Sequence, residues 1–206
     1  MKVLLVNGSP HEKGCVYTAL SEIASRLEQN GVQSEIHWIG KGDIQGCRAC
    51  GYCKAKGRCV IDDDVNSVLA RIEEFDGFVF GAPVYYSGPA GQLCTWMDRF
   101  FYCSKGRLDG KVAASVVNAR RGGNTESFVR LNQYYLMNNM IVPGSQYWNQ
   151  THGNTPEQVK QDVEGLQTMR TLADNIAWII KCIEAGKSAG ITKPAREDKT
   201  FTNFIR

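Results

Sequence analysis

An uninterrupted apolar run at the start of the chain most constrains its fold. Residues 3–6 read Val-Leu-Leu-Val, and a glycine-containing loop at 7–14 follows directly. A run without polar alternation is typical of a strand that a parallel sheet buries on both faces. From Tyr17 onward, apolar residues recur at steps of three and four until Asn30 and Gly31, which is a helical period with a stop signal. The first 30 residues therefore predict a buried strand, a loop and a helix.

The loop between this strand and helix has the features of an anion site. It opens into a helix start, where unpaired backbone N–H groups and the helix dipole attract negative charge. It has neither the G-x-G-x-x-G spacing of dinucleotide loops nor the Gly-Lys-Ser/Thr ending of triphosphate loops. It offers hydroxyl groups instead, which suit a single monoester phosphate. The alternative is an ordinary turn capped by Ser9.

Strands and helices alternate five times along the chain. Further strands are expected at 34–39, 77–82, 111–118, and 140–142 with an extension at 145–148. Helices are expected at 65–74, through 93–101, from Asn124 or Thr125 onward, and at 156–185, with a loop at 149–154. This alternation predicts an α/β fold with a doubly wound, five-stranded parallel sheet in the order 2-1-3-4-5 and helices on both faces. We expect residues 1–185 to form a single domain and 186–206 a tail that reaches a neighbouring subunit.

Two further loops follow predicted strands, where ligands bind in open parallel sheets. The loop 83–91 carries Tyr85 and Tyr86, whose rings would make a wall for a flat ligand. A proline-rich turn that shields the next helix is the alternative. The fourth strand ends at Arg120 and Arg121, followed by two glycines. Paired arginines there suit an anion or a carbonyl edge, although they could equally be solvated charges on a turn.

Four of the eight cysteines lie in one short loop at 46–59. Their spacing is C-x2-C-x2-C-x5-C, and arginines and lysines alternate with them. Three thiols two residues apart can reach three corners of a cubane, which favours a 4Fe-4S cluster. Thiols with redox or packing roles, a zinc site and disulfides are the alternatives, in that order. We expect this loop at the same sheet edge as the other three, close to their ligand. The predicted metal ligands are Cys47, Cys50, Cys53 and Cys59.

Composition places the chain in a familiar class. With 206 residues, 43% hydrophobic and 22% charged, it fits one compact α/β domain. A net charge of +3 without a long basic run argues against nucleic acid as a partner. No signal-peptide core follows Met1, and the apolar stretch 176–180 is far short of the about 20 residues that span a bilayer. We expect a cytoplasmic protein with no membrane partner.

Several motifs together resemble the iron-sulfur flavoproteins, a branch of the NADPH-dependent FMN reductases in the flavodoxin-like superfamily. The resemblance extends from Met1 to about Cys182 and implies a flavodoxin-like fold that binds FMN. The motifs are Gly8-Ser9-Pro10, the segment from Cys47 to Cys59 with Val-Ile-Asp-Asp-Asp behind it, Ala82-Pro83-Val84-Tyr85, and Met97-Asp98-Arg99.

The resemblance implies a role for each of the three ligand loops. The FMN phosphate would be bound by Ser9, His11, Gly14, Cys15, Val16, Tyr17 and Thr18. The isoalloxazine ring would be flanked by Pro83, Val84, Tyr85, Tyr86 and Ser87. Its pyrimidine edge would face Arg120, Arg121, Gly122 and Gly123. An arginine there would place positive charge beside the negative charge that grows on a reduced flavin.

The predicted function is that of an FMN-dependent oxidoreductase. Electrons would pass from a reduced donor, with NAD(P)H as a transient donor, through FMN to a small-molecule acceptor or a redox protein. A non-catalytic flavodoxin-like module with structural zinc, or with a thiol switch at Cys50 and Cys53, is the alternative. The aromatic helix 96–102 and the unpatterned tail suggest apolar surface that needs cover. Together with the pairing of subunits that the resemblance implies, they predict a homodimer or homotetramer.

Overall fold

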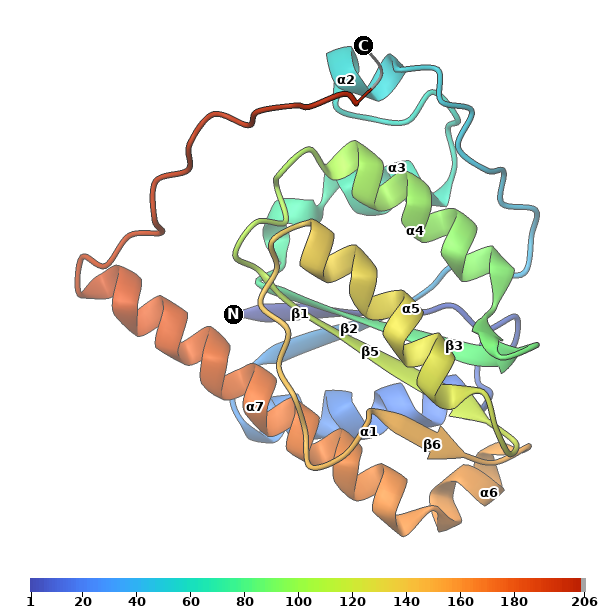
Figure 1. Cartoon of the computed structure of the whole chain (residues 1–206). Helices are drawn as coiled ribbons and strands as arrows, with labels where there is room; N and C mark the ends of the chain where they lie inside the picture. The colour runs from blue at the N-terminus through green and yellow to red at the C-terminus, as the bar shows by residue number, and fades with distance from the viewer. Residues whose placement is uncertain (205–206) are drawn as a thin grey trace.

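The computed structural model describes residues 1–204, and a mostly parallel sheet forms its centre (Figure 1). The sheet has the order β2-β1-β3-β5-β6, and a two-residue strand, β4 (Gly88–Pro89), pairs antiparallel with β3. Without β4, the parallel strands have the predicted order 2-1-3-4-5 when they are counted along the chain. Their bounds are Lys2–Asn7 for β1, Gln33–Trp38 for β2, Gly77–Tyr85 for β3, Val112–Ala119 for β5 and Gln150–His152 for β6.

The central strands are buried on both faces, as their apolar runs predicted. Leu5 of β1 pairs in register with Ile36 of β2 and with Val79 of β3, and Val79 also pairs with Ala114 of β5. Every residue of β5 is buried. Helices must therefore cover the sheet on both sides, because neither face is left for water.

Two helical layers enclose the sheet (Figure 1). One layer contains α1 (Cys15–Gln29) and α7 (Val163–Ser188), whose apolar residues pack with Val3 and Leu5. The other contains α3 (Asp64–Ala70), α4 (Gly91–Ser104) and α5 (Asn124–Met137), which pack against Leu4 and Val6. Alternate residues of β1 thus enter opposite cores, as the period of a strand requires. Short elements complete the chain: α2 (Tyr52–Lys56), η1 (Ile72–Glu74) and α6 (Pro156–Gln161).

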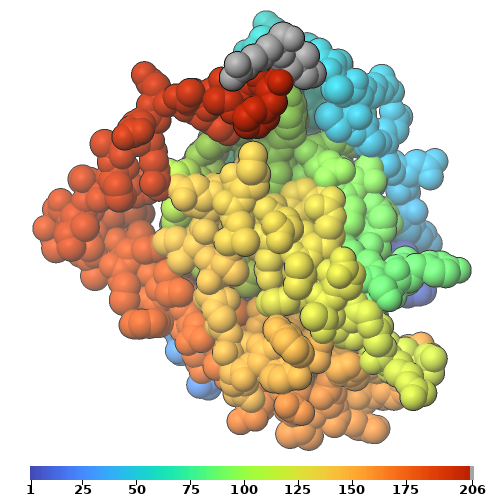
Figure 2. Space-filling view, viewed as in Figure 1, coloured from blue at the N-terminus to red at the C-terminus, as the bar shows by residue number. Residues whose placement is uncertain are grey.

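The aromatic helix does not supply the exposed apolar surface that we expected. Trp96 and Phe100 of α4 are fully buried and stack with ring centroids 4.8 Å apart. Phe101 packs on Phe80 of β3, and in this stretch the exposed aromatic ring is that of Tyr102. These rings cover the sheet instead of a neighbouring subunit. The tail after α7 has no regular structure over 191–204, and Figure 2 shows it (red) running over the surface of the molecule.

The predicted position of the fifth parallel strand was wrong. Ile141 makes a single bridge to Val112, whereas β6 forms at 150–152, in the predicted loop. Side chains hold β6 there: the Thr151 hydroxyl donates to Asn118 Oδ1 at 2.9 Å, and Asn118 Nδ2 donates to the Gly153 carbonyl at 3.0 Å. A buried polar pair thus selects the strand, and hydropathy alone cannot detect it.

Two predicted helices are interrupted. The segment 65–74 forms α3 and then the 3-10 turn η1, with the break at Arg71. The closing helix is split between α6 and α7 at Asp162, whose ψ of 77° is not helical. The Asp162 carboxylate accepts from the backbone N–H of Gly165 at 2.9 Å and of His152 at 2.7 Å. Asp162 therefore caps the N-terminus of α7 and joins it to β6, and the predicted helix is not continuous through this residue. Within residues 1–204, no helix has the length and apolarity to cross a membrane.

Candidate functional site

The loop between β1 and α1 is held in one shape by its own hydrogen bonds. Asn7 Oδ1 accepts from the Ser9 N–H at 3.1 Å, and Asn7 Nδ2 donates to the Glu12 carbonyl at 2.9 Å. Ser9 Oγ accepts from the His11 N–H at 3.2 Å. The Trp38 indole, at the end of β2, donates to the Ser9 carbonyl at 2.8 Å. The loop is therefore preorganised before any ligand binds.

The start of α1 is open to an anion. Gly14 is its N-cap, and no side chain caps the helix, whose first N–H groups have no intrahelical partner. A Cβ on Gly14 would lie 2.9 Å from the Cβ of His11, and a Cβ on Gly8 would lie 2.7 Å from the Leu93 side chain. The backbone thus approaches closely where only glycine fits, and the helix start fits a phosphate.

A cavity of about 590 Å³ adjoins this helix start. It is lined by residues 10–15 of the loop, by Trp38 and Lys41, and by residues 154–156. Its lining includes His11, Gly14 and Cys15 but not Ser9, Val16, Tyr17 or Thr18. Ser9 and Val16 are buried, and the Thr18 hydroxyl donates to the Gly14 carbonyl at 3.1 Å. Lys13 and Lys41, two further cations at this cavity, belong to no sequence motif that pointed to a ligand.

The predicted aromatic loop after β3 is a β-hairpin. Val84 and Tyr85 pair with β4, and the two turn residues, Tyr86 and Ser87, have φ values of 50° and 62°. Two successive positive φ values are the geometry of a two-residue type I′ hairpin turn. Tyr85 is 50% exposed and Tyr86 is fully exposed. The two rings thus lie on a structured element at the carboxyl end of β3 and are free to contact a flat ligand.

The arginine-containing loop touches this hairpin. A Cβ on Gly123 would lie 2.7 Å from Val84 Cγ1 and 2.8 Å from Ser87 Cα, so the two segments are in backbone contact there. Arg120 and Arg121 are exposed, and Gly122 is exposed beside them. The first loop adjoins the same edge, because the Gly8 N–H donates to the Gly81 carbonyl of β3 at 2.9 Å. The fold therefore brings the three predicted ligand loops together.

The cysteine loop does not join them, and that prediction was wrong. Residues 46–59 lie against the C-terminal half of α4, where Arg99, Tyr102 and Cys103 line the same small cavity. The hairpin enters α4 at Gly91, which is about 12 Å from Arg99 along a helix that rises 1.5 Å per residue. Figure 1 shows α2 beyond α4, on the side away from the sheet. Gln92 anchors the connection by donating to the Gly40 carbonyl at 2.8 Å.

The four loop cysteines line one cavity but differ in exposure. Cys47 and Cys50 are exposed, whereas Cys53 and Cys59 are buried. The cavity measures about 20 Å³, which is room for one water molecule. Over residues 1–204, no three His, Cys, Asp or Glu side chains form a group that could hold a metal ion. As placed, the thiols do not fit a metal centre, and the predicted cluster remains a prediction.

Arg99 fixes the cysteine loop to α4, a role that the sequence did not predict. Its side chain is fully buried and forms a two-pronged ion pair with Asp63, at 2.6 and 2.7 Å. It also donates to Cys59 Sγ at 3.3 Å and to the carbonyls of Gln45 and Ile61. Although burial lowers the pKa of Arg99, the hydrogen bonds that it donates to Asp63 and Cys59 hold its pKa above the usual value. An arginine in the apolar pattern of a helix is the signal that could have revealed it.

Cys103 is a fifth thiol at this cavity. It is 2% exposed, and burial together with the neighbouring Cys53 and Cys59 thiols raises the pKa of Cys103 to about 12. It lies 1 helical turn beyond Arg99 on α4, outside the spacing that singled out the other four. No sequence motif pointed to it.

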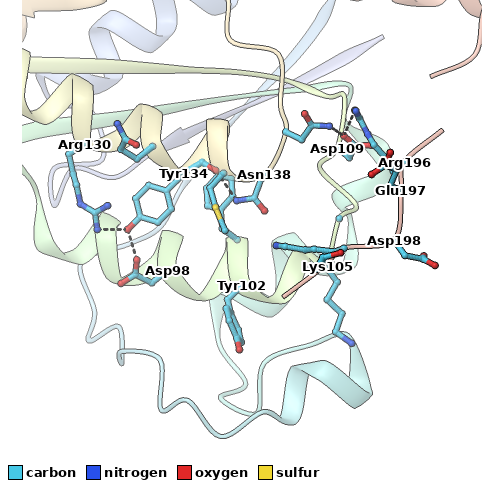
Figure 3. Close-up of a pocket in the computed structure, with 17 residues that line it drawn as sticks. Asp98, Tyr102, Lys105, Asp109, Arg130, Tyr134, Asn138, Arg196, Glu197 and Asp198 are labelled. Atoms are coloured by element: carbon cyan, nitrogen blue, oxygen red, sulfur yellow. Dashed lines mark hydrogen bonds and ion pairs between the residues drawn. The ribbon is translucent and has the colours of Figure 1, made fainter. Parts of the chain in front are cut away.

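A third cavity, of about 1260 Å³, lies between α4, α5 and the tail (Figure 3). The Tyr134 hydroxyl donates to Asp98 and accepts from Arg130 Nη2 at 3.3 Å. Burial and the Asp98 carboxylate raise the pKa of Tyr134. The tail is tied down where Lys193 donates to the Asp109 carbonyl at 2.8 Å. These residues belong to α4, α5, the turn before β5 and the tail, away from the strand ends that carry the three ligand loops.

Known proteins resemble this chain in sequence and in fold. Residues 1–155 match the family model of NADPH-dependent FMN reductase. An iron-sulfur flavoprotein of Methanocaldococcus jannaschii is 32% identical over 192 residues, which cover 89% of this chain and 100% of the relative. The chain therefore belongs to the NADPH-dependent FMN reductase family.

Solved structures extend the likeness in fold. A structure of RosB with a bound flavin derivative, 8-demethyl-8-formylriboflavin-5'-phosphate, has a TM-score of 0.72 at 13% identity, covering 100% of this chain and 94% of RosB. The NAD(P)H:quinone oxidoreductase of Methanothermobacter marburgensis has a TM-score of 0.65 at 16% identity, covering 85% of this chain and 98% of that protein. At these identities the matches establish the flavodoxin-like fold.

Proposed function

We propose that this chain is an FMN-dependent oxidoreductase that takes electrons from NAD(P)H and delivers them to a small-molecule acceptor or a redox protein. The observation that carries the proposal is the convergence of three segments at one sheet edge: an uncapped helix start, a tyrosine hairpin and an arginine-containing loop. When bound, FMN supplies the redox chemistry, and the protein contributes binding, orientation and charge. Membership of the FMN reductase family supports the same function.

Each segment would bind a different part of the cofactor. The backbone of Gly14, Cys15 and Val16 would bind the phosphate at the α1 start, with the helix dipole in support. Lys13 and Lys41 would add positive charge at the same cavity. Ser9 would act indirectly, since its hydroxyl already stabilises the loop through the His11 N–H.

The ring would lie over the hairpin. Tyr85 and Tyr86 would contact its flat face, with Pro83, Val84 and Ser87 behind them, because aromatic rings prefer offset stacking. Arg120 and Arg121, with the backbone of Gly122 and Gly123, would lie at its polar edge and stabilise negative charge there. The donor would use the open face of the ring, since the first loop lacks a dinucleotide spacing.

An added negative charge in the first loop tests the site. His11→Glu places a carboxylate in the lining of the cavity at the α1 start, and like charges in contact cost several kcal/mol, so we expect FMN affinity to fall by about 100-fold or more. His11→Gln is the matched control, because it has the same size as the Glu variant without the charge. Fluorescence titration of the metal-free chain with FMN measures both. Equal affinities for the Glu and Gln variants would contradict the phosphate assignment.

The cysteine loop stays outside this mechanism. The relative from Methanocaldococcus jannaschii is named an iron-sulfur flavoprotein, and this chain has four cysteines with the spacing C-x2-C-x2-C-x5-C. Anaerobic reconstitution with iron and sulfide, followed by metal analysis and a visible spectrum, tests whether these cysteines bind a 4Fe-4S cluster. Zinc in place of iron, with no flavin absorption, would instead support the non-catalytic module.

A further inference from the structure

Three buried thiols, two from the cysteine loop and one from α4, line one small cavity. They are Cys53 and Cys59 of the loop and Cys103 of α4. All three line the small cavity, together with the exposed Cys47 and Cys50. Within the described chain, these side chains form no group that could hold a metal ion. Their proximity instead allows chemistry between pairs of thiols.

Cys53 is freer to move than Cys59. The Cys59 backbone is held on both sides by Asn66, at 2.8 and 3.0 Å, and its Sγ accepts from Arg99 at 3.3 Å. Cys53 lies on the five-residue helix α2 between Gly51 and Gly57, which have φ values of 71° and 66°. Glycines in the left-handed region at both ends allow this short helix to shift as a unit.

We propose that Cys53 and Cys103 form a redox-active disulfide that fastens the cysteine loop to α4 when the loop holds no metal. A low-molecular-weight disulfide is the oxidant. The exposed Cys50 thiolate attacks it and releases one small thiol; Cys53 then attacks the mixed disulfide at the Cys50 sulfur and releases the second. Cys103 attacks the Cys53 sulfur as it loses its proton, and that proton ends on the departing Cys50 thiolate, which frees the Cys50 thiol. The two electrons and two protons lost by Cys53 and Cys103 are carried by the two small thiols.

This inference is separate from the proposed flavin chemistry. The disulfide would remove Cys53 from the set of thiols available to a metal ion, so the same loop would have an oxidised, metal-free state. It would also join α2 to α4 across a long stretch of sequence, and such a bridge constrains the unfolded chain. The oxidised protein should therefore have a higher Tm than the reduced protein.

Peptide mapping of the full chain tests the disulfide. The protein is stripped of metal with chelator and reductant, incubated with oxidised glutathione, unfolded and alkylated. Trypsin releases Cys103 in the peptide 100–105 and Cys50 with Cys53 in the peptide 49–54, and fragmentation assigns the bonded sulfur. We expect the Cys53–Cys103 linkage as the main product, with Cys50 alkylated and a Tm that falls again on reduction.

Two serine variants sharpen the test. Cys103→Ser should stop the exchange at a Cys50–Cys53 disulfide and abolish the rise in Tm. Cys94→Ser, a second α4 cysteine that does not line the cavity, should leave the linkage unchanged. If Cys103 of the oxidised wild-type chain is alkylated, or if it pairs with Cys59, the proposal is wrong. This readout needs no variant, so it decides the question even where Cys103→Ser folds poorly.

Discussion

At the scale of single residues, Arg99 makes the contacts that hold the cysteine loop against α4. It joins a helix to both ends of the cysteine loop, through Gln45 on one side and Cys59, Ile61 and Asp63 on the other. Asp63 also caps α3, since its carboxylate accepts from the Val65 N–H at 3.2 Å. Loss of the guanidinium would therefore loosen the loop and leave a carboxylate without its partner.

Arg99→Gln should lower the free energy of unfolding by about 3 kcal/mol, because removing one partner of a buried ion pair costs about 3–5 kcal/mol and Asp63 is 27% exposed. Urea denaturation followed by circular dichroism measures the loss. Arg130→Gln is the matched control on α5, where the arginine lies over the Tyr134 ring at the surface. Equal losses in the two variants would show that Arg99 has no special role.

At the scale of elements, the β3–β4 hairpin presents the predicted tyrosine pair, Tyr85 and Tyr86, at the surface. Its turn residues adopt the left-handed conformation, which favours glycine and asparagine, yet the chain has Tyr86 and Ser87 there. Local strain of this kind is retained where surrounding contacts fix the conformation. Here the turn contacts Gly123, and Ser127 Oγ donates a hydrogen bond to the Ser87 carbonyl at 3.4 Å.

Replacing both Tyr85 and Tyr86 with alanine should weaken FMN binding by about tenfold, since each aromatic contact is worth about 0.5–1.5 kcal/mol. The stability of the flavin-free chain should change by less than about 0.5 kcal/mol, because exposed side chains contribute little. FMN titration and urea denaturation measure the two quantities. Tyr147→Ala, at another exposed tyrosine, is the control. Unchanged affinity in the double variant would reduce the hairpin to a packing element.

At the scale of the whole molecule, a charged network joins segments that are distant in the chain. Glu35 of β2 accepts from both terminal nitrogens of Arg71 at 2.8 Å, and Lys2 of β1 lies 2.8 Å from the same carboxylate. The hydrogen bonds from Arg71, with those from Lys2, lower the pKa of Glu35 to about 2. The network thus ties the edge strand to the first strand and to the end of α3.

Acid should reveal this network. Because the pKa of Glu35 is lower in the folded chain than the about 4.3 of an unfolded glutamate, its contribution is fully present above that value and is lost as pH falls toward 2. The free energy of unfolding, measured in urea between pH 5 and pH 2.5, should fall less steeply in Glu35→Gln than in the wild-type chain. Glu126→Gln, an exposed glutamate on α5, is the control. Identical slopes in wild type and Glu35→Gln would contradict the assignment.

Assembly remains a prediction at this scale. We propose a homodimer or homotetramer. The aromatic helix is buried and does not support this proposal, but the tail does, because its side chains Ile191, Phe201 and Phe204 are 69%, 82% and 95% exposed. Exposed apolar side chains gathered in one segment favour association. Light scattering at micromolar concentration should give two or four chains per particle, and fewer after deletion of residues 191–206. A monomeric full-length chain would contradict the proposal.

The sequence by itself determined the positions of the first four parallel strands and of the first helix, because burial on both sheet faces leaves a hydropathy pattern that local composition records. It also located the glycine loop, the tyrosine pair and the arginine pair. Tertiary structure decided the rest. The hydrogen bond between Thr151 and Asn118 selects the position of β6. The closing helix breaks where Asp162 accepts a hydrogen bond from β6. The cysteine loop lies against α4, where Arg99 binds it, and not at the sheet edge. Such contacts join residues far apart in the chain, so no local pattern encodes them.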